Sequence, residues 1–490
     1  MKQWKNSNVK IFFGMLALSL LIVILLLPVP PPIKTTVKEI SLTPQGKTTL
    51  AVLAMAVLLW MTEAVAFPVT GLLAIVVLVV TKAQPFRELV KNGFGSPIFL
   101  FFLGVLIITA AISETGILHR IALWLLHKLG HKPKYVILFF LTMGTLMAFW
   151  ITDMAVAAML FPLAVSILKD AGVEPLKSNF GRTLMISCAW GPLMGGIATP
   201  VGCGTNPLTI SFLKDLAGVD ITFANWMVMG APASIMMLPC AWLILLKIFP
   251  MENINVKVSR EDFKKKMNTI GPVTRKEFLT VLIFGLTIFL WVSKDFIKVW
   301  TGGAIDYLDI SFVAIMCPCL FFLPGIEILD WKRMQQSINW GGIILIVTGL
   351  SIGMAIYNSG AAEWLAWVLF NKIGMLHPIG IVFVIVLGVS LMKVLFSSNT
   401  VTGVIIVPLL IALAKNLGLD PVLVAVPAGI TSSLAFILVT STPTNVIPYS
   451  AGYFSIVDMA KAGLWMTVAS SITVTASICI FGRLFHVVNW

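Results

Sequence analysis

Long apolar segments separated by short polar connections run through the whole chain. The plainest of them are 11–30, 48–66, 222–249, 279–298 and 463–482. An apolar segment of about 18 or more residues is long enough to cross a bilayer as a helix. The pattern therefore predicts an all-α polytopic membrane protein. Other apolar segments are shorter or contain Gly, Pro and small polar residues, which indicates interrupted helices.

Small polar residues interrupt the apolar pattern at corresponding places in the two halves of the chain. The stretches WITDMAVAAMLFPL and FSSNTVTGVIIVPL have the same layout. In this alignment Thr152 and Asp153 correspond to Ser398 and Asn399. Four small polar residues beside long apolar segments are unexpected unless the helix is broken there and lies against a polar space.

A second matched pair of interruptions follows in each half. It consists of GGIATPVGCGTNP and ILVTSTPTN, in which Asn206 corresponds to Asn445. An earlier pair of segments matches as well, with Gly116 corresponding to Gly360. Several landmarks in the same order predict an internal repeat.

Each repeat has room for about five crossings and a shorter, broken element, at about 20 residues per crossing. An odd number of crossings inverts the second repeat relative to the first, as in many secondary transporters whose interrupted helices meet near the bilayer midplane. Ser and Thr also join ordinary membrane helices through hydrogen bonds. Clusters that occur as matched pairs favour the transporter interpretation.

The positions of the basic residues predict which segments face the cytoplasm. Lys and Arg gather at the amino terminus and in a segment between the repeats, so membrane topology explains the formal net charge of +13 better than nucleic-acid binding does. By the positive-inside rule both regions face the cytoplasm. We expect a retained N-terminal helix with its connection (1–47), a first inverted repeat (48–250), a basic cytoplasmic linker (251–278) and a second inverted repeat (279–490).

The interrupted helices predict what the protein binds. The amino terminus of a helix offers free backbone N–H groups and the positive end of the helix dipole. Two such termini, with hydroxyl and amide side chains beside them, suit an anion with two separated negative groups.

Few ionisable residues lie in or near the apolar segments. They are Glu63, Glu114, Asp153, Glu363 and Lys393. We expect interfacial or packing roles for Glu114 and Glu363. Asp153 and Lys393 belong to opposite repeats and could pair or replace a bound cation. For Lys393 the alternative is snorkelling toward an aqueous surface.

The sequence contains no motif that indicates a metal site or a catalytic site. The five histidines and six cysteines show no metal-ligand spacing, and no nucleophile and base form a recognisable pair. We expect no metal, no cofactor and no enzymatic activity. An intramembrane enzyme is a distant alternative, and a channel would be distinguished by single-channel currents.

The chain resembles the divalent anion:sodium symporter family, the carriers of di- and tricarboxylates and, in some branches, sulfate. The resemblance rests on WMTEAVAFPVTGLL, on the Ser-Asn-Thr motif that begins at Ser398, and on STPTN, which begins at Ser441. It implies a homodimer in which each protomer has about eleven membrane-spanning helices and two re-entrant hairpins. It also implies separate scaffold and transport domains and an elevator-like displacement of the substrate.

The resemblance also implies the residues of the substrate site. The substrate-binding residues expected from it are Thr152, Asp153, Met154, Cys203, Gly204, Ser398, Asn399, Thr400, Thr442 and Pro443. In the first repeat the family has Ser-Asn-Thr where this chain has Thr152, Asp153 and Met154. This chain also departs from the family's Gly-Thr-Pro-Pro-Asn around Cys203 and Gly204.

The departures from the family extend to sodium coupling. Sodium-coupled members place a hydroxyl residue four positions before each Ser-Asn-Thr motif, whereas this chain has Ala148 and Val394. Lys393 is then a candidate fixed cation that compensates substrate charge. Asp153 could repel the substrate, rebuild a cation site or couple transport to protons, and the sequence leaves these roles open.

The resulting prediction is a sodium-independent exchanger of C4–C5 dicarboxylates such as succinate, malate or 2-oxoglutarate. The alternative is a sodium-coupled di- or tricarboxylate symporter. A short basic leader without a transit peptide favours a multi-pass protein of a bacterial plasma (inner) membrane, with the lipid bilayer, the dicarboxylates and a second copy of the chain as its partners.

Overall fold

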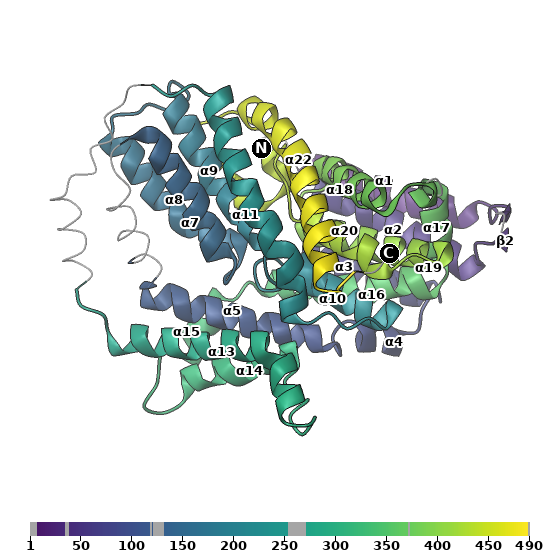
Figure 1. The fold of residues 1–490 in the computed structure, drawn as a ribbon. Helices are drawn as coiled ribbons and strands as arrows, with labels where there is room; N and C mark the ends of the chain where they lie inside the picture. The colour runs from purple at the N-terminus through teal and green to yellow at the C-terminus, as the bar shows by residue number, and fades with distance from the viewer. Residues whose placement is uncertain are drawn as a thin grey trace.

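The computed structural model describes residues 7–34, 39–117, 120, 132–252, 271–370 and 373–488, and these residues are almost entirely helical (Figure 1). One short antiparallel pair of strands is the exception in the described ranges. It joins β1 (Ile33–Lys34) to β2 (Glu39–Ile40). The predicted all-α class is therefore confirmed apart from this small hairpin.

The helices of the first half begin with α1 (Ser7–Leu26), before the repeat. They continue with α2 (Pro44–Thr62), α3 (Phe67–Val80), α4 (Phe86–Asn92), α5 (Pro97–Thr115), α7 (Pro133–Ala148), α8 (Asp153–Asp170), α9 (Asn179–Gly196), α10 (Thr205–Ala217) and α11 (Phe223–Ile248).

The second half has the same order of long and short helices. Its helices are α13 (Arg275–Trp300), α14 (Ile310–Cys319), α15 (Trp331–Ser337), α16 (Trp340–Asn358), α17 (Ala361–Phe370), α18 (Pro378–Met392), α19 (Asn399–Leu417), α20 (Pro421–Thr431), α21 (Pro443–Tyr449) and α22 (Ile456–Ser477). Short 3-10 or π turns are η2 (Leu320–Phe322), η3 (Ile373–Met375), η4 (Lys393–Leu395), η5 (Val439–Ser441) and η6 (Ile478–Gly482).

Nine helices in the described part of the chain are long and apolar enough to cross a membrane. All five of the plainest apolar segments in the sequence lie on such helices, namely α1, α2, α11, α13 and α22. Shorter apolar helices, among them α3, α7 and α20, accompany the long ones. The prediction of a polytopic membrane protein is thus confirmed at this level.

The two halves exchange contacts in a reciprocal way. Helix α5 of the first half packs against α14 of the second, while α16 of the second half packs against α3 of the first. In the same manner α10 packs against α19 and α20, while α21 packs against α8 and α9. Each half therefore completes the packing of the other.

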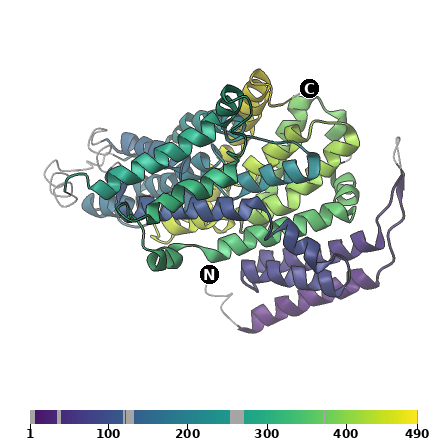
Figure 2. The same ribbon diagram turned by 90° about the horizontal axis from the view of Figure 1, so that it is seen from below.

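The helices form two groups. The hairpin bundle consists of α7–α11 and α18–α22, and the flanking bundle consists of α1–α5 and α13–α17. Figure 1 shows α7, α8 and α9 above α5 and α13–α15, and Figure 2 shows the N-terminal helices along one side of the molecule. Contacts between the bundles include those of α19 with α16 and α17.

Glycines allow two long helices of the hairpin bundle to approach interrupted backbone. A Cβ added to Gly230 of α11 would lie 2.3 Å from the carbonyl oxygen of Ile197, and one added to Gly463 of α22 would lie 2.2 Å from that of Phe436. Ile197 and Phe436 are in the interruptions after α9 and α20. These glycines are therefore required by close backbone contact.

Replacing Gly463 by alanine tests this contact. We expect Gly463→Ala to lower the melting temperature of the purified protein, because overpacking a tight interface costs about 1–3 kcal/mol. The control is Gly285→Ala in α13, where an added Cβ meets nothing within 4 Å and alanine favours the helix by about 1 kcal/mol. Equal melting temperatures for the two variants in a thermal-shift measurement would contradict this account.

Candidate functional site

The first pair of interruptions lies where the Thr152 and Ser398 segments were predicted to break the helices. Helix α7 ends at Ala148 and α8 begins at Asp153, while η4 ends at Leu395 and α19 begins at Asn399. Thr152 and Ser398 occupy the N-cap positions of α8 and α19. The Oγ of Ser398 accepts a hydrogen bond from the backbone N–H of Val401 at 3.5 Å.

The second pair of interruptions is held by two asparagines. Asn206 donates from Nδ2 to the carbonyl oxygens of Gly196 and Thr199, at 2.8 and 2.7 Å. Asn445 donates in the same way to Ala435 and Leu438, at 2.7 and 3.2 Å.

Both asparagines are completely buried. Carbonyls at the end of a helix lack partners within the helix, and a buried carbonyl without a partner is costly. Each amide therefore supplies hydrogen-bond partners to carbonyl groups of the non-helical segment that begins where its helix, α9 or α20, ends. This role explains why Asn206 and Asn445 recur at corresponding positions in the two halves.

Asp153 joins interruptions from both halves. Its backbone N–H donates to the carbonyl oxygen of Gly202 at 3.0 Å. Its Oδ2 accepts a hydrogen bond from the hydroxyl of Thr444 at 3.2 Å, and its Oδ1 accepts one from the N–H of Met154 at 2.8 Å. These bonds fix the orientation of a buried carboxyl group.

Asn399 makes the corresponding contact from the second half. Its Nδ2 donates to the Sγ of Cys203 at 3.7 Å. A Cβ on the neighbouring Gly204 would lie 3.5 Å from the Oγ1 of Thr400. Asn399 is buried, and its Oδ1 has no hydrogen-bond partner among the described residues. The amide thus has an acceptor available for another group.

Further hydroxyl groups complete this buried cluster. Thr205 and Ser433 share a hydrogen bond of 2.5 Å between their Oγ atoms, which joins the second interruptions of the two halves. The hydroxyl of Thr442 donates to Thr444 at 3.4 Å, and Thr444 in turn contacts Asp153. Pro443 begins α21 directly after Thr442.

The residues predicted from the sequence therefore lie at four neighbouring interruptions of the hairpin bundle. Sequence reasoning singled out Asp153, Cys203 and Asn399 but gave no role to Thr205, Ser433 or Thr444. A usable signal was present, because Thr205 and Thr444 both directly precede the matched asparagines Asn206 and Asn445.

Lys393 is buried within the protein, with 1% of its surface exposed. Its Nζ donates to the carbonyl oxygen of Ser441 at 2.9 Å, and the hydroxyl of Ser441 donates to the carbonyl oxygen of Lys393 at 3.1 Å. The alternative that Lys393 snorkels to an aqueous surface is therefore wrong.

The helix around Lys393 explains its position. An unbroken helix would place Lys393 about 140° away from Ser398. Helix α18 instead ends at Met392, and η4 and an extended Phe396 follow before α19 begins. This change of direction brings the side chain of Lys393 toward Ser441. A buried ammonium is costly unless it has a partner, and the carbonyl oxygen of Ser441 provides one.

The remaining ionisable candidates lie away from this cluster. Glu114 forms an ion pair with Arg333 at 3.5 Å, with both side chains partly exposed, and Glu63 is exposed at the end of α2. His377 accepts a hydrogen bond at the start of α18. His119, His127 and His131 lie outside the described residues. Within the described ranges no group of three or more His, Cys, Asp or Glu side chains could hold a metal ion.

Comparison with known proteins places the chain among membrane transporters. It is 28% identical to the sodium-dependent dicarboxylate transporter SdcS of Staphylococcus saprophyticus, over 96% of this chain and 92% of that protein. It is also 28% identical to the protein of the same name from Staphylococcus aureus strain USA300, over 88% of this chain and 85% of that protein.

A solved structure shares the fold. The crystal structure of the Alcanivorax borkumensis YdaH transporter matches with a TM-score of 0.56 and 14% sequence identity, and the match covers 98% of each chain. At this identity the likeness concerns the fold alone.

The model of the sodium:sulfate symporter transmembrane region matches residues 8–488, which is nearly the whole chain. The members of this family are transporters, so the prediction that the chain is not an enzyme is confirmed. The buried cluster described above thus lies inside a carrier, and the chain belongs to the sodium:sulfate symporter family.

Proposed function

We propose that this chain is a secondary transporter of C4–C5 dicarboxylates. The observation that carries the proposal is the convergence of four helix interruptions, two from each half, on one buried polar cluster. Such interruptions bind anionic substrates in secondary transporters. The names of the staphylococcal relatives, which are dicarboxylate transporters, support the same substrate class.

The amino termini of α8 and α19 would bind the two carboxylate groups of the substrate. The first N–H groups of a helix have no carbonyl partner within that helix, although in α8 that of Met154 donates to the carboxyl group of Asp153. At the start of α19, Ser398, Asn399 and Thr400 add hydroxyl and amide groups. The other proposed substrate-binding residues lie at the interruptions nearby. They are Thr152, Met154, Cys203 and Gly204 of the first half and Thr442 and Pro443 of the second. Neutral donors of this kind bind an anion without a buried arginine.

The two bundles would supply an elevator mechanism. All residues of the proposed site belong to the hairpin bundle, in which α7–α8 and α18–α19 act as two re-entrant hairpins. The flanking bundle would serve as the scaffold and form the interface of a homodimer. With the shorter apolar helices included, each protomer would have about eleven crossings, arranged as two inverted repeats in a bacterial plasma membrane.

The basic residues near the linker support a cytoplasmic location for that side. Arg120 forms a bidentate pair with Glu277 of α13, with a shortest N–O distance of 3.0 Å, and donates to the carbonyl oxygen of Gly271 at 2.7 Å. The end of the linker region is therefore fixed beside the segment after α5. We propose that this side and the amino terminus face the cytoplasm.

Two observations favour different coupling mechanisms. The relatives are named sodium-dependent transporters, which favours sodium-coupled symport over the exchange that we predicted from the sequence. Sodium coupling is accordingly the first candidate. Asp153, a buried carboxylate at the start of α8, could provide an oxygen ligand for such an ion.

Sodium-independent exchange is the second candidate, and Lys393 favours it. Its ammonium already lies against the carbonyl oxygen of Ser441, at the second interruption of its own half. Since Val394 and Ala148 supply no side-chain oxygen, a fixed cation would take the place of a bound one. Lys393 and Asp153 carry opposite formal charges, so together they would leave the cluster close to neutral.

Transport assays in proteoliposomes separate these candidates. We expect labelled succinate to enter vesicles in a saturable way that unlabelled dicarboxylates inhibit. Uptake into empty vesicles that rises with external sodium would establish symport, whereas uptake that requires preloaded dicarboxylate and ignores sodium would establish exchange. A protein that carries no dicarboxylate under either condition would contradict the proposed function.

Replacing Asn399 by alanine tests the substrate site. We expect Asn399→Ala to lower transport at least tenfold at low substrate concentration, because a buried hydrogen bond to a charged partner contributes about 1.5–3 kcal/mol. The control is Asn225→Ala, at a partly exposed position in the first turn of α11. Normal flux in Asn399→Ala, measured beside an unchanged elution profile, would remove Asn399 from the site.

Replacing Lys393 tests the fixed cation. We expect Lys393→Ala to weaken dicarboxylate binding about tenfold or more, because it removes a buried positive charge from a cluster that also holds the carboxyl group of Asp153. The double variant Lys393→Ala with Asp153→Asn removes both charges and should recover part of the loss. Equal affinity in Lys393→Ala and the unmodified protein, measured by competition in proteoliposomes, would show that Lys393 has no part in charge compensation.

A further inference from the structure

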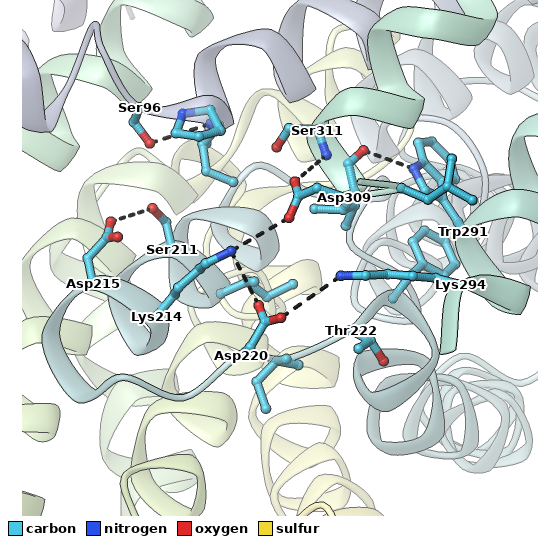
Figure 3. Close-up of a pocket in the computed structure, with 17 residues that line it drawn as sticks. Ser96, Ser211, Lys214, Asp215, Asp220, Thr222, Trp291, Lys294, Asp309 and Ser311 are labelled. Atoms are coloured by element: carbon cyan, nitrogen blue, oxygen red, sulfur yellow. Dashed lines mark hydrogen bonds and ion pairs between the residues drawn. The ribbon is translucent and has the colours of Figure 1, made fainter. Parts of the chain in front are cut away.

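A second charged cluster lies between the two bundles, around a cavity at the far end of α10 (Figure 3). Residues of α5, α10, α11, α13 and α14 line this cavity, which holds about 100 Å³ of space for water-sized molecules. The charged residues are Lys214, Asp215, Asp220, Lys294 and Asp309.

Two of the three ion pairs around the cavity cross from one bundle to the other. Lys214, in α10 of the hairpin bundle, lies 3.6 Å from Asp309, which caps α14 of the flanking bundle. Asp220, in the connection between α10 and α11, lies 3.9 Å from Lys294 of α13. The third pair, Lys214 with Asp220 at 3.6 Å, lies within the hairpin bundle.

Each side of the cluster is anchored in its own bundle. Asp309 accepts a hydrogen bond from the backbone N–H of Ser311 at 2.9 Å, which orients its carboxylate toward Lys214 (Figure 3). Beside the ion pairs, the ring of Phe223 in α11 stacks on that of Trp291 in α13, with centroids 5.0 Å apart. The contact between the bundles is therefore both ionic and aromatic.

Helix α10 connects this cluster to the proposed substrate site. It begins at Thr205, within the buried hydroxyl cluster, and Lys214 lies in its last turn. At about 1.5 Å per residue a helix of this length spans about 20 Å. A displacement of the substrate site along α10 would therefore carry Lys214 and Asp220 away from their partners in the flanking bundle.

The ion pairs between the bundles are individually weak, as a contact that opens repeatedly must be. The four side chains are between 19% and 54% exposed, and exposed ion pairs contribute little individually. A small group of them can bias the population of two conformations without preventing their exchange.

We propose that the Lys214, Asp220, Lys294 and Asp309 cluster is an ionic latch that holds the hairpin bundle against the flanking bundle in one conformation and opens in every transport cycle. This inference rests on the elevator mechanism of the proposed function. It assigns a conformational role to charged residues that do not contact the substrate.

Cysteine cross-linking tests the latch with a matched control. Asp220→Cys combined with Lys294→Cys places two thiols across the bundles, whereas Asp220→Cys combined with Lys214→Cys places them within the hairpin bundle. Both variants also carry Cys319→Ser, because Cys319 is exposed. We expect a short thiol-specific cross-linker that reductant can cleave to stop dicarboxylate transport in the first variant and to leave it unchanged in the second.

The untreated variants separate the latch from the proposed function. Transport before cross-linking and after reduction would show that the carrier works, whatever the latch does. Full transport by the cross-linked Asp220→Cys and Lys294→Cys variant would overturn the latch and the elevator displacement on which it rests, while dicarboxylate transport itself would stand. Absence of dicarboxylate transport in the unmodified protein would instead contradict the proposed function.

A charge-neutralising variant tests the ionic part of the contact. We expect Lys294→Gln to raise the maximal transport rate about twofold to fivefold at low ionic strength, and the difference to shrink in high salt as the charges are screened. The control is Lys298→Gln, one turn further along α13. Identical rates for Lys294→Gln and Lys298→Gln at low ionic strength would show that the ion pairs do not hold the hairpin bundle against the flanking bundle.

Discussion

The need to satisfy backbone groups inside a membrane protein determines much of this structure. A helix that stops within the bilayer leaves carbonyl and N–H groups without partners, and lipid cannot supply them. Here Asn206 and Asn445 donate to the carbonyls that follow the ends of α9 and α20. The interruption before α8 is satisfied in another way, since the N–H groups of Asp153 and Met154 donate to the carbonyl oxygen of Gly202 and to the carboxyl group of Asp153. The two asparagines therefore stabilise the interrupted backbone next to the buried polar cluster.

The two buried charged residues of the cluster also have hydrogen-bond partners. Lys393 and Asp153 come from opposite halves, and each has hydrogen-bond partners in an interruption of the chain. Lys393 contacts a backbone carbonyl, while Asp153 accepts from a hydroxyl and a backbone N–H. The two halves are therefore chemically unequal although their helices follow the same order. That inequality distinguishes this chain from the symmetric Ser-Asn-Thr pattern of the family it resembles.

The helical fold and most members of the buried polar cluster could be predicted from the sequence. Apolar length identified the long helices, and matched polar interruptions identified the segments that meet at Asp153 and Asn399. The orientation of Lys393 could not be predicted, because helical geometry fails where α18 gives way to η4 and an extended residue. The roles of Thr444 and Ser433 depend on contacts between halves, which no single stretch of sequence reveals. The contact of Lys214 with Asp309 likewise depends on the packing of α10 near α14, which no local pattern predicts.

The reciprocal packing of the halves also bears on how the chain is made. Helix α10 finds its neighbours α19 and α20 only in the second half, which leaves the ribosome much later. During synthesis the first half must wait in the bilayer with part of its polar surface uncovered, a state in which chaperones and insertion machinery act. A first half that is produced alone would therefore lack the contacts of α10 with α19 and α20.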